Sequence, residues 1–244
     1  LAAVMLIPAF LALRRGYEVF ALEEPLNERM FPLIELLTKL FTGAASFELL
    51  RSDLPSIYVG LPVLALFGSY ALNPAFPARR RVLTAGLVGV FLISFQMSGP
   101  YLLWHGLDLP QAMPARFSFL FSFLLIDLAY ESFRTLTQAG AGLARRMGAM
   151  ALAFFAAVCL MFDGELPTYL AYETVCLDVL CFLASCGLIA LLVTRRRRVA
   201  LVCLCVMQAA CLVINGYFAI HRLEEVNQLS AQEDKAYVQK YTAL

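Results

Sequence analysis

Long apolar stretches alternate with short polar segments along most of this 244-residue chain. A membrane-spanning helix needs about 20 mostly apolar residues, and in hydrocarbon its backbone must satisfy its own hydrogen bonds. The pattern shows no period of two, which would indicate strands. It therefore predicts an all-α, polytopic bundle of about seven membrane helices. The predicted spans are residues 1–13 (truncated at its start), 54–72, 82–98, 117–133, 147–163, 167–194 and 199–220.

Composition agrees with a membrane protein and argues against a soluble domain or a nucleic-acid-binding protein. Hydrophobic residues make up 61% of the chain and charged residues 15%, whereas soluble domains carry about 25% charged residues. The net charge is +1 and there is no long basic tract, so a nucleic-acid partner is not expected. The seven cysteines lie in apolar runs without the spacing of metal ligands. We expect them to be small buried hydrophobic residues, and we expect neither a metal nor another cofactor.

Arginines in alternate loops predict the orientation. They occupy positions 79–81, 134, 145–146 and 195–198, whereas Arg116 is the one Lys or Arg in loops 99–116 and 164–166. Because positive loops stay cytoplasmic, loop 99–116 and the C-terminus are expected to face outward from a bacterial cytoplasmic membrane.

The predicted domain organisation follows from these spans. Residues 1–220 form the helix bundle, which includes an outward segment at 14–53, and residues 221–244 begin an outward C-terminal region. The chain is expected to be an internal fragment of a larger protein. Within the outward segment, the sequence FPLIELLTKLF (31–41) predicts a short helix. This helix either lies in the membrane interface or packs on the outer mouth of the bundle.

The loop at 99–116 gathers polar groups between two apolar stretches. Trp104 suits a membrane interface, and Arg116 just before the fourth span can hold a phosphate by two parallel hydrogen bonds. His105 can bind a phosphate or a sugar, or move a proton, and Asp108 can orient either group. Alternatively, Arg116 only contacts lipid headgroups and His105 only anchors the interface. Three prolines, Pro100, Pro110 and Pro114, are expected to prevent regular helix through the loop.

Several carboxylates fall within predicted spans. Asp127 and Glu131 share a helix face, and a local pair of Glu131 with Arg134 is favoured over a proton path. Glu173 and Asp178 lie in the outer half of the sixth span. They either line an outward cavity or cap the helix as it leaves the interface.

Two segments resemble a known family. YLLWHGLDLPQAMPARFSFLFSFLLIDLAYESF (101–133) is similar to the signature region of the YfhO family of bacterial multi-pass membrane proteins, which reads approximately N-L-x-W-H-G-F-x-x-P-N-x-F-P-Y-R-F-S-F-L-F-S-F. LPSIYVGLPVLALFG (54–68) resembles a second family element, P-N-I-Y-x-G, through Pro55, Ile57, Tyr58 and Gly60. The chain departs from these patterns at Ser56, Gln111, Met113 and Ala115.

The resemblance implies a function. YfhO-like proteins look like GT-C-type glycosyltransferases, which take a sugar from a polyprenyl-phosphate carrier at the outer leaflet and pass it to a cell-surface polymer such as lipoteichoic acid. The catalytic carboxylate is expected in a first outward loop that this chain does not contain. The expected binding residues for the lipid phosphate or sugar are Arg116, His105, Trp104, Asp108 and Tyr58. The alternative is a transporter or flippase of lipid-linked glycans, in which the carboxylates within the spans would matter most.

Overall fold

A computed structural model describes residues 33–44, 55–105, 115–161, 170–194 and 197–242 of the chain, with side chains described up to residue 221 except at 33, 34, 194 and 197. Within these ranges the chain is all-helical and has no strand, as the sequence predicts. Its helices, in chain order, are α2 (Leu33–Thr38), α4 (Leu61–Leu72), α5 (Ala78–Gln96), α6 (Ser98–Trp104), α7 (Ser118–Thr135), the 3₁₀ turn η1 (Leu136–Gln138), α8 (Ala141–Met161), α9 (Tyr172–Thr194) and α10 (Arg197–Thr242).

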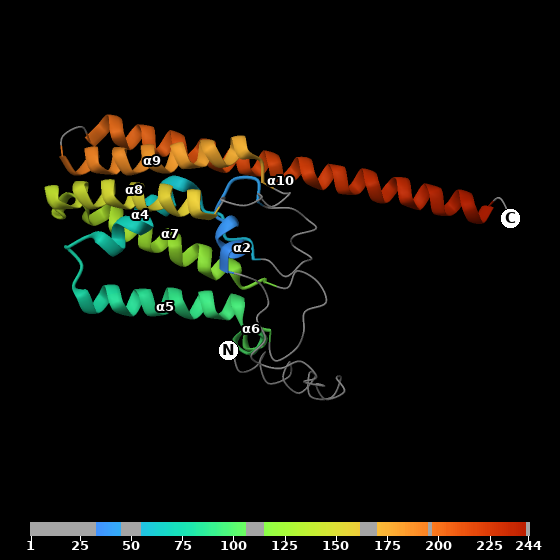
Figure 1. The fold of residues 1–244 in the computed structure, drawn as a ribbon, viewed down its shortest axis with the longest axis horizontal. Coiled ribbons are helices and arrows are strands. Elements are labelled where there is room, and N and C mark those ends of the chain that lie inside the picture. Colours follow the sequence, from blue (N-terminus) through green and yellow to red (C-terminus); the bar gives the residue numbers. More distant parts are fainter. Residues whose placement is uncertain (1–32, 45–54, 106–114, 162–169, 195–196, 243–244) are drawn as a thin grey trace, which may run out of the picture.

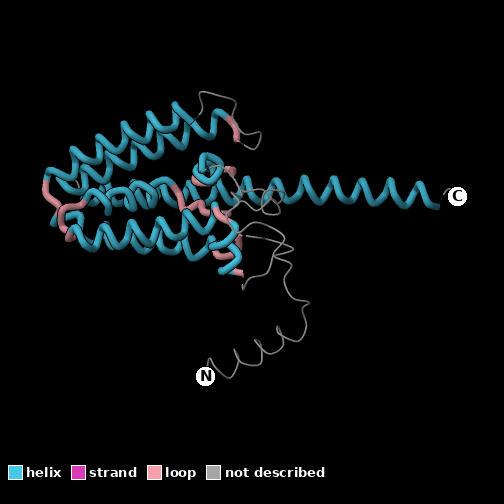
Figure 2. Tube along the Cα trace, turned by 60° about the horizontal axis from the view of Figure 1, so that its bottom comes forward, coloured by secondary structure: helices cyan, strands magenta, loops and turns pink. Residues whose placement is uncertain are grey.

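The long helices lie side by side, and the short helix α4 is at the centre of the bundle (Figures 1 and 2). It contacts α7, α8, α9 and α10. Ser69 of α4 and Ser132 of α7 lie 2.6 Å apart, oxygen to oxygen, and Asn73 donates to Thr135 at 3.0 Å. Such small polar residues allow close packing between apolar helices and satisfy one another there.

The second predicted span is shorter than its apolar stretch suggests. Residues 55–60 are not helical, and α4 begins only at Leu61. Gly60 has a φ of +87°, a conformation that interrupts a helix and that L side chains rarely adopt. Pro62 lies in the first turn of α4, where its missing N–H leaves no hydrogen bond unmade. The prediction of one continuous span over 54–72 was therefore wrong.

Three described helices are long and apolar enough to cross a membrane: Ala141–Met161, Tyr172–Val193 and Arg198–His221. They correspond to the last three predicted spans. Helix α4 has only 12 residues. Charged residues shorten the apolar part of the other two helices: arginines 79–81 lie at the start of α5, and α7 carries Asp127, Glu131 and Arg134. The first predicted span, 1–13, lies outside the described residues, and the total of about seven remains a prediction.

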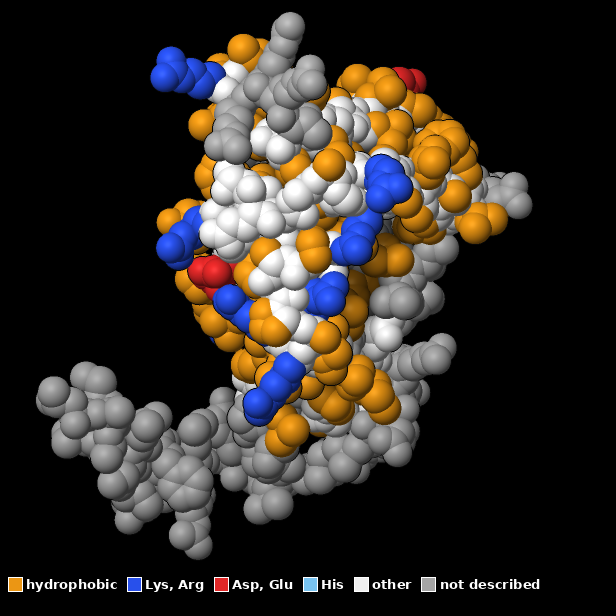
Figure 3. Space-filling view, turned by 90° about the vertical axis from the view of Figure 1, so that its left-hand side faces the viewer, with side chains coloured by type: hydrophobic (Ala, Val, Ile, Leu, Met, Phe, Trp, Pro, Cys, Tyr) orange, Lys and Arg blue, Asp and Glu red, His pale blue; other side chains and the backbone are white. Residues whose placement is uncertain are grey.

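Seven arginines of the described residues gather at one end of the bundle: Arg79, Arg80, Arg81, Arg134, Arg145, Arg146 and Arg198. This end holds the start of α5, the end of α7, the start of α8 and the start of α10, and Figure 3 shows Lys and Arg side chains spread across it. We call it the basic end. At the opposite end lie α2, α6 and the start of α7 (Figure 1). The helices therefore place the alternate arginine loops together, which is the arrangement that the orientation argument requires.

Helix α6, near the opposite end, differs from expectation. Pro100 lies within helix α6, in its first turn, where a proline can be accommodated. The prediction that Pro100 excludes helix was therefore wrong, and Pro110 and Pro114 lie outside the described residues. Helix α10 continues without a break to Thr242 and projects beyond the other helices (Figure 1).

The helix predicted near residues 31–41 is present as α2 and packs into the bundle. Leu36 is buried in a cluster with Ile57 and Phe95. Phe41, in the turn after α2, is buried against Val158 and Val179. Of the two alternatives for this helix, the contacts match packing on the mouth of the bundle.

Candidate functional site

A stack of aromatic rings joins the two halves of the signature segment. Trp104, at the end of α6, lies over Phe91 and Phe117, with ring centroids 5.4 Å and 5.0 Å away. Phe117 also stacks on Phe95 at 4.8 Å. We call these rings, together with Tyr101 and His105, the aromatic cluster. It brings residues from either side of the segment 106–114 into direct contact.

His105 is held by the aromatic cluster. Its ring lies 4.5 Å from the Tyr101 ring, and its Nδ1 is 3.1 Å from the Tyr101 carbonyl oxygen. Because a carbonyl oxygen only accepts, Nδ1 is the donor of this hydrogen bond. In the neutral ring Nε2 then becomes the acceptor, which is the form that can take a proton or bind a hydroxyl.

Arg116 lies exposed in the turn that leads into α7, next to Phe117 in the chain. Trp104 is also partly open, with 41% of its surface exposed. The structure thus places Trp104 and His105 together against the residue that follows Arg116. Asp108, the fourth candidate in this loop, lies outside the described residues.

Tyr58 belongs to a second, buried group of polar residues. Its hydroxyl lies 3.0 Å from the hydroxyl of Thr42 and donates to the Cys211 carbonyl at 3.4 Å. The Asp178 carboxylate accepts from both the backbone N–H and the hydroxyl of Thr42, at 2.6 Å and 2.7 Å. Asn215 accepts from the Gly43 N–H at 3.0 Å. We call Thr42, Tyr58, Asp178 and Asn215 the polar cluster.

The polar cluster fixes the turn after α2 to helices α9 and α10. Asp178 is only 4% exposed, and a buried carboxylate is tolerated only where hydrogen bonds or charges satisfy it. Lys39, equally buried, donates to the Ala44 carbonyl at 2.9 Å and closes the same turn. Asp178 therefore neither lines an open cavity nor caps its helix, which were the two sequence-based alternatives. It holds a turn in place.

The segment 55–60 connects the two clusters. Ile57 is buried in the hydrophobic cluster that contains Phe95 and Phe117, whereas the neighbouring Tyr58 reaches Thr42. A Cβ on Gly60 would lie 2.5 Å from the side-chain oxygen of Gln208. Gln208 in turn donates to the Val59 carbonyl at 2.8 Å. The second resembling element, through Ile57, Tyr58 and Gly60, is thus the piece of chain that ties the aromatic cluster to the polar cluster.

The other charged residues in the helices are arranged differently. Glu131 lies 3.5 Å from Arg134, as predicted, and also 3.4 Å from Arg80, at the basic end. Asp127 and Glu173 are exposed. Asp127, Glu131, Glu173 and Asp178 therefore do not meet along one path.

The cysteines match the prediction only in part. Cys186 and Cys211 are buried, but Cys159, Cys176 and Cys205 are exposed on the outside of the bundle. Lipid tails are as apolar as the interior of the bundle. An apolar run therefore does not distinguish a buried cysteine from one that faces lipid. All seven are free thiols, and the described residues contain no group of His, Cys, Asp and Glu that could hold a metal.

Sequence reasoning missed Thr42 and Asn215. Asp178 stood out as a carboxylate in an apolar stretch, but a threonine in a turn and an asparagine in a helix carried no signal of their own. Their partners are 136 and 172 residues away along the chain. Only the fold brings these residues together.

The comparison with known families decides the identity. The family model described as "Bacterial membrane protein YfhO" matches residues 1–244, the whole of the chain. This chain belongs to the YfhO family. No curated protein matches it, and no solved structure matches it. Membership in the YfhO family and the apolar helices together indicate a membrane protein.

Proposed function

We propose that this YfhO-family chain is part of a GT-C-type membrane glycosyltransferase. Its donor is a sugar on a polyprenyl-phosphate carrier, and its acceptor is a cell-surface polymer resembling lipoteichoic acid. The observation that carries the proposal is the contact of Trp104 and His105 with Phe117, the residue that follows Arg116. The family assignment supports it.

The side chains suit the chemistry of this transfer. An acceptor hydroxyl attacks the anomeric carbon, the bond from that carbon to the phosphate oxygen breaks, and the leaving phosphate gains negative charge. An arginine at the membrane surface stabilises that charge, and an aromatic face binds the apolar side of a sugar ring. His105 binds a phosphate or sugar oxygen. The proton of the acceptor hydroxyl passes to a carboxylate base.

The proposed orientation follows from the basic end. Arginine-rich loops remain cytoplasmic, so the aromatic cluster at the opposite end would face the outer surface. There it would meet a lipid-linked sugar at headgroup level.

The test is sugar transfer by the complete protein in lipid vesicles. We expect Arg116→Ala to reduce transfer from a labelled polyprenyl-phosphate sugar by about 10²-fold. Arg116→Lys keeps the charge but loses the paired hydrogen bonds, so it should be intermediate. Arg79→Ala, an exposed arginine at the basic end, is the control and should transfer normally.

Two results would overturn this proposal. Wild-type transfer and donor affinity in Arg116→Ala would remove Arg116 from the binding site. Movement of the intact lipid-linked glycan from one leaflet of the vesicle membrane to the other, without transfer of its sugar, would favour a flippase instead. The buried Asp178 and the paired Glu131 argue against that alternative, because each carboxylate already has local partners.

A further inference from the structure

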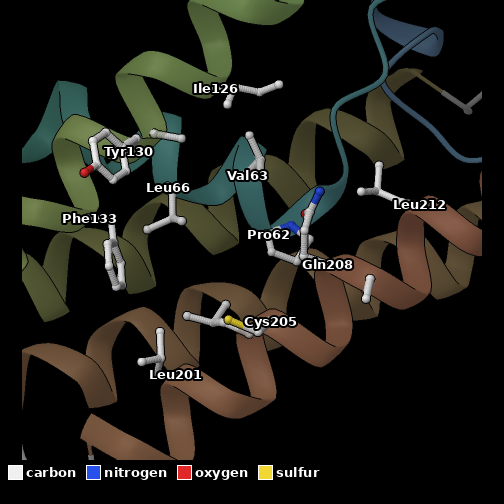
Figure 4. Close-up of a pocket in the computed structure, with 13 residues that line it drawn as sticks. Pro62, Val63, Leu66, Ile126, Tyr130, Phe133, Leu201, Cys205, Gln208 and Leu212 are labelled. Atoms are coloured by element: carbon white, nitrogen blue, oxygen red, sulfur yellow. The ribbon is translucent and has the colours of Figure 1, made fainter.

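An apolar groove runs along the outside of the bundle between α7 and α10, with α4 as its floor. Its volume is about 500 Å³. Figure 4 shows Tyr130 and Phe133 on one side, Leu201 and Leu212 on the other, and Val63 and Leu66 between them. Several of these side chains are substantially exposed, including Tyr130 at 57% and Leu212 at 51%. The groove is therefore open to the surroundings of the bundle along its length.

A second cavity, of about 320 Å³, adjoins the groove at the basic end. The two share Phe133 and Leu201. The second cavity adds Arg134 from the end of α7 and Arg198 from the start of α10. A trough with an apolar body and a cationic end is complementary to an anionic lipid, which has apolar chains and a negative headgroup. Basic pockets between membrane helices commonly bind such headgroups.

We propose that this trough binds one anionic diacyl phospholipid, with its phosphate between Arg134 and Arg198 and its acyl chains along α7 and α10. Along α10 the groove runs from Leu201 to Leu212, a rise of about 16 Å at 1.5 Å per residue. That is close to half of a hydrocarbon core of about 30 Å, which is the depth of a single leaflet. The length fits a phospholipid of that leaflet better than a long polyprenyl chain.

The cations of the trough can accept an anion. Arg134 lies 3.5 Å from Glu131, but this carboxylate also has Arg80 at 3.4 Å. Within the described residues, no carboxylate forms an ion pair with Arg198. A phosphate would therefore add a partner without leaving Glu131 unpaired. This site lies at the opposite end from the aromatic cluster, so it is distinct from the proposed donor site.

The experiment is native mass spectrometry of the complete protein with equal amounts of phosphatidylglycerol and phosphatidylcholine. With two arginines at the head, we expect phosphatidylglycerol to be favoured by about 5-fold to 30-fold. The double variant R134Q/R198Q should lose this preference. The control R79Q/R145Q removes two exposed arginines from the same end but outside the trough, and should keep it.

A second variant tests the acyl groove separately from the charges. Ala209 lines the groove, so Ala209→Trp should fill it and reduce bound phosphatidylglycerol while both arginines remain. An unchanged melting temperature would show that the variant is folded. The proposal is wrong if R134Q/R198Q binds phosphatidylglycerol as the wild type does, if phosphatidylcholine binds equally, or if folded Ala209→Trp retains the lipid. Displacement of phosphatidylglycerol by equimolar polyprenyl phosphate would also overturn it.

Discussion

The two ends of the bundle hold their polar groups in opposite ways. At the basic end Glu131 pairs with Arg80 and Arg134, and their side chains are 27%, 50% and 61% exposed. At the other end Asp178 and Thr42 are 4% and 5% exposed and satisfy each other by hydrogen bonds. Exposed ion pairs are screened and weak, whereas a buried polar group is costly once its partner is lost.

The difference separates charged groups that can bind a ligand from charged groups that already hold the fold together. Arg134 at the basic end can bind an added anion, because its ion pair with Glu131 is exposed and 3.5 Å long. The polar cluster is occupied in holding the turn after α2 and the segment 55–60, which together support the aromatic cluster. We therefore expect mutations at the two ends to differ sharply in their effect on the free energy of unfolding.

The largest effect is expected at Gly60. Gly60→Ala places a Cβ at a φ of +87°, and the Gln208 amide, 2.5 Å away, must move and give up its hydrogen bond to the Val59 carbonyl. We expect a loss of about 2–4 kcal/mol, measured by denaturant titration in mixed micelles. Gly86→Ala in α5 is the control, because nothing lies within 4 Å of the added Cβ. That variant should be unchanged or slightly more stable, and equal losses in both would refute the steric argument.

The second largest loss of stability is expected at the buried carboxylate of Asp178. Asp178→Leu leaves the backbone N–H of Thr42 without an acceptor, which should cost about 2–3 kcal/mol in the same titration. Asp178→Asn is the informative partner. Its amide can accept from that N–H and donate to the Thr42 hydroxyl, so the loss should stay below about 1 kcal/mol. A large loss in both variants would show that the negative charge itself is needed.

The fold class and the basic end could be predicted from the sequence, because both rest on local composition. The aromatic cluster could be anticipated only as a segment, since the contact of Trp104 with Phe117 depends on how α6 turns back. The break at residues 55–60 is signalled by Pro55 and Gly60, but 61–72 continues the apolar run and disguised the boundary. The contact of Thr42 with Asp178 could not be predicted, because neither residue determines the partner of the other.

A smaller effect is expected at Thr42. Thr42→Val keeps the backbone hydrogen bond to Asp178 but removes the hydroxyl that contacts both Asp178 and Tyr58. We expect a loss of about 1 kcal/mol. The control is Thr84→Val, whose hydroxyl lies 3.2 Å from that of Tyr70 in a less buried place. If Thr84→Val costs as much as Thr42→Val, burial does not distinguish these two hydroxyl contacts.

The smallest effect on stability is expected at Glu131, where it separates stability from binding. Glu131→Gln breaks two partly exposed ion pairs and should change the free energy of unfolding by less than about 0.5 kcal/mol. The same change removes negative charge beside Arg134, so phosphatidylglycerol bound in native mass spectrometry should increase. Asp127→Asn, exposed on the same helix but outside the trough, should change neither quantity. A Glu131→Gln variant that lost more than about 2 kcal/mol would place this end in the costly class of buried polar groups, and the contrast between the two ends would fail.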